Sequence, residues 1–256
     1  MTVLKDIYDV IDAEAPFHTA LDFDNVGILV GDNHAPVHRV LLCLDITKEI
    51  VLEAVSKNAD TIISHHPIIF GTLKELRMDS VPYLLAQHGI SALCCHTNLD
   101  LSPSIGVNVA LGKSLGFKET YKADLDDMSN PLFIGALETP CKAKDFAKQV
   151  KTDLNAKNVQ LLDKGKEIKT VAFSCGAGAS CIEEAVKSGA DIFLTGEMDY
   201  HDIQELDNAG MSAITAGHFE TECIYAQYLA KYLRKMFPEI GFITAETECN
   251  PLEAVI

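Results

Sequence analysis

The sequence of 256 residues contains no tryptophan, and aromatic residues make up only 7% of it. We therefore expect a core that is mainly aliphatic, with some phenylalanine and tyrosine. No apolar stretch reaches 18 residues, so no transmembrane helix is predicted. None of the eight cysteines forms a C-x-x-C pair, so a structural zinc ribbon is not indicated. Several cysteines lie in apolar runs such as Leu41–Leu44, and we interpret them as small buried side chains in a reducing compartment rather than as disulfides or redox centres.

Positive charge is also scarce. Lysine and arginine number 21 against 37 aspartates and glutamates, which gives a formal net charge of −16. Such a surface repels phosphate backbones, and no run of basic residues offsets it, so the composition argues against a nucleic-acid partner. Near the N-terminus, Leu4, Ile7 and Ile11 recur at helical spacing, which predicts an amphipathic helix rather than a signal peptide. We expect a cytoplasmic protein with no membrane partner.

Strand and helix patterns alternate along the chain, which predicts an α/β fold. A strand at 39–44, a helix at 48–57 capped by Thr47 and a strand at 60–64 form a first β-α-β unit. A helix at 80–88 and a strand at 90–95 follow. The polar, acidic segment 121–128 is a plausible domain boundary.

The second half of the chain resembles the first. Aligned without gaps, Val171–Asp191 matches Val40–Asp60, and the His-x-x-x-carboxylate pattern of 96–100 recurs at 218–222. We infer an internal duplication. The alternative is that two ordinary β-α-β units have converged on the same pattern.

Histidines and carboxylates gather directly after the predicted strands. The pair His65-His66 is the most informative, because two imidazoles after a buried strand need polar partners. Strands of open α/β sheets present their ligand sites at the carboxyl ends. Mixed imidazole and carboxylate ligands suit zinc, iron, manganese, cobalt or nickel, and a pair of such ions activates water. The remaining groups are His96 with Asp100, Glu197 with Asp199 and His201, and His218 with Glu222.

Two further motifs leave alternatives open. Glu197 and His201 could instead be an acid at a helix N-terminus and a surface histidine. The turn Cys175–Gly178 could be a simple tight turn or a ligand contact, since the full G-x-G-x-x-G pattern is missing. No P-loop is present.

Five motifs, in this order and over most of the chain, resemble those of the dinuclear metal-centre proteins known as GTP cyclohydrolase I type 2 homologues, the NIF-three-like family. The five are Asp24–Gly31, Ser64–Pro67, His96–Asp100, Thr195–Asp202 and Gly217–Glu222. The resemblance implies two divalent metal ions per subunit, with Glu222 as a candidate bridging ligand. It places Glu197 and His96 beside the metals, where they could transfer protons. The implied metal ligands are His65, His66, Asp100, His218 and Glu222.

The resemblance also implies two related α/β domains, with the metal site at the carboxyl ends of strands. We place them at 1–124 plus about 214–256 and at about 125–213. It further implies a toroidal homohexamer, a trimer of dimers. We expect a metal-dependent hydrolase with an unknown small-molecule substrate. The alternative is a non-catalytic protein that binds or delivers metal, or an assembly protein.

Overall fold

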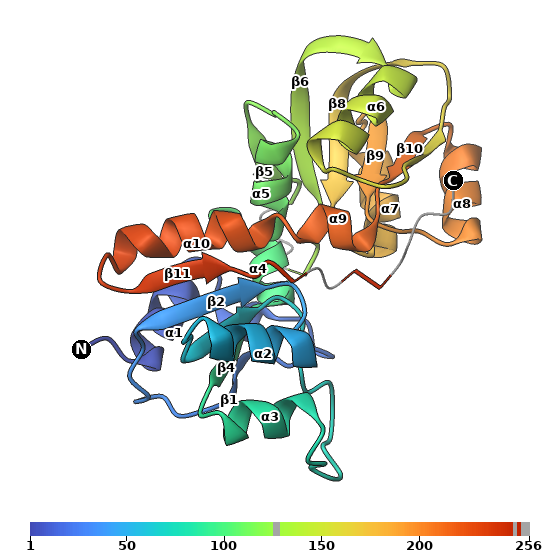
Figure 1. Cartoon of the computed structure of the whole chain (residues 1–256). Helices are drawn as coiled ribbons and strands as arrows, with labels where there is room; N and C mark the ends of the chain where they lie inside the picture. Colours follow the sequence, from blue (N-terminus) through green and yellow to red (C-terminus); the bar gives the residue numbers. More distant parts are fainter. Residues whose placement is uncertain (125–128, 248–249, 252–256) are drawn as a thin grey trace. The chain divides into compact units, whose positions relative to one another are not determined.

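The computed structural model describes residues 1–124, 129–247 and 250–251, and Figure 1 shows the chain. Contacts between Cα atoms divide these residues into two compact units. The first contains Met1–Ile105 and Tyr225–Pro251, and the second contains Gly106–Ile224. Each unit holds one sheet with helices, so the fold is mixed α/β. The predicted domain boundaries near residues 124 and 213 stay a prediction, and residues 125–128 at the first of them lie outside the described residues. Cys249 also lies outside the described residues.

The first unit is built on a five-stranded sheet in the order β1-β4-β3-β2-β11. Strands β2, β3, β4 and β11 run parallel, whereas β1 pairs antiparallel with β4. Every residue of β3 and β4 is buried, which is typical of parallel strands covered on both faces. The strands are Gly27–Val30 (β1), Arg39–Cys43 (β2), Thr61–Ser64 (β3), Ser91–Cys94 (β4) and Gly241–Thr244 (β11).

Helices of the first unit form where the sequence places apolar residues at helical spacing. The predicted N-terminal helix is confirmed, with Leu4, Ile7 and Ile11 buried along one stripe. Thr47 caps α2 as predicted, because its side chain accepts a hydrogen bond from the Ile50 N–H. Burial of an isoleucine such as Ile50 contributes about 1.5–3 kcal/mol. The helices are Leu4–Glu14 (α1), Lys48–Ser56 (α2), Val81–Gln87 (α3), Thr97–Leu101 (α4) and Tyr225–Met236 (α10).

The second unit is built on a six-stranded sheet in the order β5-β6-β8-β9-β10-β7. Its central strands β8, β9 and β10 run parallel, and the other pairings are antiparallel. The strands are Thr120–Lys122 (β5), Phe133–Lys142 (β6), Gln160–Leu162 (β7), Glu167–Ser174 (β8), Ile192–Thr195 (β9) and Ser212–Thr215 (β10). The helices are Val107–Ser114 (α5), Ala143–Asp153 (α6), Ile182–Lys187 (α7), Tyr200–Ala209 (α8) and His218–Glu222 (α9).

The structure refines the predicted C-terminal region. The His-x-x-x-carboxylate pattern of 218–222 forms a short helix of its own, α9, and a separate helix, α10, begins at Tyr225. The edge strand β11 was not predicted. Only Phe242 of its four residues is fully buried, so the apolar alternation that marks a strand is weak there.

Two compositional features have structural counterparts. No helix in the described part of the chain is long and apolar enough to cross a membrane. No disulfide joins the seven cysteines that the structure describes, and five of them are buried. Burial raises the pKa values of the Cys94 and Cys95 thiols, which makes both poor nucleophiles.

Candidate metal centre

Three imidazoles converge at the carboxyl ends of two neighbouring strands in the first unit. His65 and His66 follow β3, and His96 follows β4, which lies beside β3 in the sheet. Their ring centroids are 5.0–5.3 Å apart. One ligand nitrogen of each lies within 4.8 Å of the others, so the three could hold a metal ion.

The backbone after β3 fixes the two adjacent histidines. The N–H groups of His65 and His66 both donate to the Leu44 carbonyl, at 3.2 Å and 3.0 Å. The Ser64 hydroxyl donates to the carbonyl of His66 at 2.9 Å. The His65 side chain is fully buried, whereas that of His66 is 24% exposed. The turn therefore anchors one imidazole in the core and leaves the other within reach of solvent.

Each of these histidines has its Nδ1 atom beside an oxygen that can only accept a hydrogen bond. A backbone carbonyl and an ionised carboxylate have no proton to give, so Nδ1 carries the hydrogen and Nε2 keeps a lone pair. This arrangement is typical of metal-binding histidines. The distances are 2.8 Å from His65 to the Cys95 carbonyl, 2.8 Å from His66 to Asp45 and 2.9 Å from His96 to Asp24.

Asp24 is the most strongly held of these acceptors. Its side chain is fully buried, and it accepts hydrogen bonds from the backbone N–H and the hydroxyl of Thr97 as well as from His96. Burial alone raises the pKa of Asp24, but the hydrogen bonds from His96 and Thr97 outweigh it and hold the pKa at about 2. Asp24 is therefore ionised at neutral pH and fixes the imidazole of His96.

A carboxylate completes the group in the first unit. Asp100 lies in the short helix α4, which begins directly after His96. Its Oδ1 atom is 3.4 Å from Nε2 of His65, the nitrogen that faces away from the Cys95 carbonyl. The structure thus brings the predicted residues His65, His66, His96 and Asp100 together.

The other predicted ligands form a second group, within the second unit. His218 and Glu222 lie four residues apart on α9, and Nε2 of His218 is 3.1 Å from Oε2 of Glu222. Glu197 follows β9, and its Oε1 atom is 3.0 Å from Nδ1 of His218. The hydrogen bond with Glu222, and then that with Glu197, raises the pKa of His218 to about 9 against the opposing effect of burial.

Glycines shape the surroundings of Glu222. Gly176 has a φ of +58°, and a Cβ atom there would overlap Oε1 of Glu222 and lie 3.2 Å from Nε2 of His218. A Cβ at Gly196 would lie 2.9 Å from Cα of His218. The turn Cys175–Gly178 is therefore a close packing surface for a predicted ligand.

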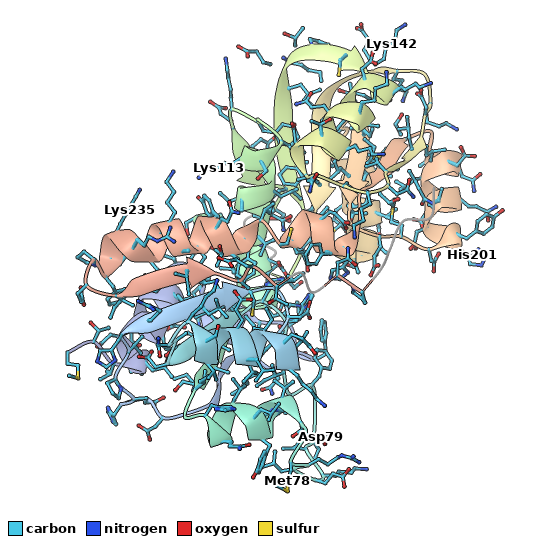
Figure 2. All side chains as sticks on the ribbon, viewed as in Figure 1. Met78, Asp79, Lys113, Lys142, His201 and Lys235 are labelled. Atoms are coloured by element: carbon cyan, nitrogen blue, oxygen red, sulfur yellow. The ribbon has the colours of Figure 1, made fainter. Side chains whose placement is uncertain are left out.

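The predicted group of Glu197, Asp199 and His201 divides into separate roles. Only Glu197 contacts another site residue. Asp199 caps α8 by accepting hydrogen bonds from the backbone N–H groups of His201 and Asp202. The His201 side chain is exposed and points outward from α8 (Figure 2). His201 is thus the surface histidine of the alternative interpretation.

Sequence reasoning missed two oxygens that hold histidines. Asp45 follows β2, whose carboxyl end lies beside that of β3, so the same argument that selected His66 could have found it. The Cys95 carbonyl carries no signal in the sequence, because every residue has a carbonyl group.

Comparisons with known proteins identify the family of the chain. The model of the family Duf34/NIF3 (NGG1p interacting factor 3) matches residues 2–251. A protein of Clostridium acetobutylicum called GTP cyclohydrolase 1 type 2 homolog is 32% identical, over 94% of this chain and 93% of that protein. One of the same name in Campylobacter jejuni is 35% identical, over 91% and 92%.

A solved structure gives the same result for the fold. The crystal structure of a hypothetical protein from Staphylococcus aureus superposes with a TM-score of 0.91 at 27% identity, covering 99% of both chains. The resemblance inferred from the five motifs is confirmed. The chain belongs to the Duf34/NIF3 family.

Proposed function

We propose that the protein is a metal-dependent hydrolase that holds two divalent metal ions per subunit. The ions are zinc, iron, manganese, cobalt or nickel, and their substrate is a small molecule. The residues that would hold these ions are His65, His66, Asp100, His218 and Glu222. His96 and Glu197 are the proposed groups for proton transfer.

One observation carries this proposal. All four histidines of the two groups have Nδ1 beside an oxygen acceptor, at 2.8–3.0 Å. Metal-binding histidines almost always donate their second ring N–H to an oxygen in this way. The exposed His38 also has Nδ1 3.0 Å from Asp60, but among the described residues it lies alone, whereas these four histidines lie beside other imidazoles or carboxylates. The donor set of imidazoles and carboxylates fits divalent transition metals, because the nitrogens and oxygens match their preference for borderline ligands.

The chain's own residues would orient the reaction. Bound ions of this kind lower the pKa of water and polarise a substrate oxygen. His96 is the proposed group that takes up or releases a proton at Nε2, because Asp24 holds its Nδ1 atom and fixes the orientation of the ring. Glu197 holds His218 in one orientation, and its side chain is 61% exposed, so it can exchange protons with solvent.

The test is a hydrolysis screen of metal-loaded protein against nucleotides and phosphoesters. We expect turnover of at least one substrate that is lost in His65→Ala. His88→Ala, at an exposed histidine, is the matched control and should keep the activity. Metal binding without turnover of any substrate above the His65→Ala background would favour the non-catalytic alternative, in which the protein stores or delivers metal.

We also propose that the two units arose by duplication. In the pairing of β2 with β3, Val40 lies opposite Thr61, and in that of β8 with β9, Val171 lies opposite Ile192. Both offsets are 21 residues (61 − 40 and 192 − 171). The parallel strands β2-β3-β4 and β8-β9-β10 each have an antiparallel strand beside their last member, β1 on β4 and β7 on β10. At the other end the sheets differ, because β2 pairs parallel with β11 and β8 pairs antiparallel with β6. These correspondences support a common origin.

The proposed assembly is a toroidal homohexamer, and it rests on the family resemblance. Light scattering coupled to size-exclusion chromatography tests it. A mass near six times the 27.9 kDa of one chain is expected. A monomer at micromolar concentration would contradict it.

A further inference from the structure

Two phenylalanines of the first unit are exposed and lie together. Phe23 is 62% exposed and Phe70 is 64% exposed, and their ring centroids are 6.2 Å apart with planes tilted by 38°. The chain has eleven phenylalanines, all within the described residues, and the other nine are buried or half-buried. An exposed aromatic pair loses the benefit of burial, so its position calls for a binding role.

Both rings are attached to the metal-binding histidines by short, fixed segments. Phe23 directly precedes Asp24, whose carboxylate lies 2.9 Å from Nδ1 of His96. Summing one Cα–Cα step, two side-chain lengths and this hydrogen bond places the Phe23 ring within roughly 15 Å of His96. Phe70 comes four residues after His66. The pair therefore lies on the two segments that carry Asp24 and His66 of the candidate metal centre.

A hydrogen bond ties the two loops to each other. The side-chain amide of Asn25 donates to the carbonyl of Ile69 at 2.7 Å. Each end of this bond is within two residues of one of the phenylalanines. The spacing of the rings is thus set by the backbone and not only by contact between the rings.

We propose that Phe23 and Phe70 form a clamp that stacks on a planar heteroaromatic ring of the substrate. This inference rests on the proposed hydrolase function. Aromatic rings stack at centroid distances of 4.5–7 Å, so a substrate ring can stack on the exposed face of either phenylalanine and contact the edge of the other. Neither side chain offers a hydrogen bond, so recognition is through ring faces.

The rest of the molecule favours a small ligand over a polymer. Base stacking on aromatic side chains also occurs in proteins that bind single-stranded nucleic acid, but those proteins use a basic groove. Here the net charge is −16, and the cations nearest the clamp in sequence, Lys74 and Arg77, are outnumbered by Asp22, Asp24, Glu75 and Asp79.

The absence of tryptophan provides a direct test. Phe23→Trp places the single tryptophan of the chain in the clamp, where it can be excited selectively over the seven tyrosines. Tyr200→Trp places it at a 70% exposed position of the second unit as a control. Metal-loaded protein is titrated with GMP, AMP, UMP and nicotinamide mononucleotide, and with ribose 5-phosphate as a probe that has no aromatic ring. We expect saturable quenching by at least one ring-bearing probe in Phe23→Trp only, and none with ribose 5-phosphate.

Removal of the second phenylalanine tests how much the clamp contributes to affinity. Phe70→Ala in the Phe23→Trp background should raise the dissociation constant about 5-fold to 150-fold, the range found for loss of one stacking partner. Quenching that is equal in Tyr200→Trp, unchanged by Phe70→Ala, or absent with every ring-bearing probe would overturn the clamp. A fall in oligomeric mass in Phe70→Ala, measured by sedimentation, would also overturn it by assigning the pair to a contact between copies.

The metal content of the same samples separates this inference from the function on which it rests. If wild-type protein binds two metal ions but the Phe23→Trp variant shows no ring-specific quenching, the clamp alone is refuted. Wild-type protein that binds no metal refutes the proposed hydrolase first.

Discussion

Replacing Gly176 by alanine should weaken metal binding although no ligand is removed. The added Cβ would overlap Oε1 of Glu222 and lie 3.1 Å from its Cδ and 3.2 Å from Nε2 of His218. Carbon atoms in contact normally stay 3.5–4.0 Å apart, so the carboxylate must move or rotate. A displaced group next to a metal typically costs 10-fold to 100-fold in metal affinity.

The backbone contributes a second effect, which a control can remove. Gly176 has a φ of +58°, where alanine costs about 1–2 kcal/mol. Gly210, in the same unit, has a φ of +69° at the end of α8, and a Cβ there would meet nothing within 4 Å. Gly210→Ala therefore carries the same backbone cost without touching Glu222. The difference in zinc affinity between the two variants therefore measures the effect of displacing the Glu222 carboxylate.

The assay is competition for zinc against a chelator, with urea unfolding of the metal-free variants measured in parallel. Both variants should lose about 1–2 kcal/mol of unfolding free energy. Only Gly176→Ala should lose metal affinity as well, by 10-fold or more. Wild-type zinc affinity in Gly176→Ala would refute the role of Glu222 as a ligand.

Three further predictions concern the supports of the site and of the first unit. Asp24→Asn should lower the unfolding free energy by about 1–3 kcal/mol in urea, because buried donors lose a charged acceptor; an unchanged value would contradict the network. Burial alone raises the pKa of Glu53, but hydrogen bonds from the Thr247 side chain, from the backbone N–H groups of 246–247 and from Lys57 outweigh it and hold the pKa at about 2. This stabilisation is therefore present above pH 4.5 and is lost as the pH falls towards 2. Glu53→Gln should lower the unfolding free energy by about 1–2 kcal/mol at pH 7, after allowance for solvent screening, and by little at pH 2. As a control, Glu183→Gln at an exposed position should change the unfolding free energy at neither pH. Asp199→Ala should cost about 1 kcal/mol of stability through loss of the α8 cap and leave metal content unchanged; loss of metal would return Asp199 to the site.

Part of the site could be predicted because chemistry and local pattern coincide. His65 and His66 follow a strand in which every residue is buried, and such a position rarely tolerates two imidazoles without partners. His218 and Glu222 are spaced by one helical turn, so a helix of any length there brings them together. In both places the secondary structure alone determines the geometry.

Other features depend on tertiary packing that no local pattern records. The carbonyl that holds His65 comes from a neighbouring strand, and any residue type could supply it. His201, like the histidines of the site, follows a strand in the sequence. It nevertheless lies outside the site, because Asp199 caps the helix α8 and His201 is exposed on that helix. The edge strand β11 is defined by its pairing with β2 and not by its own alternation.

The most direct test of the central claim is a count of metal ions in protein purified without chelators, combined with anomalous scattering from its crystals. The account predicts two ions per chain, each within bonding distance of side chains from the set His65, His66, Asp100, His218 and Glu222. It also predicts that His65→Ala lowers the count. A count of zero after growth in metal-supplemented medium, or a count that His65→Ala leaves unchanged, would contradict it.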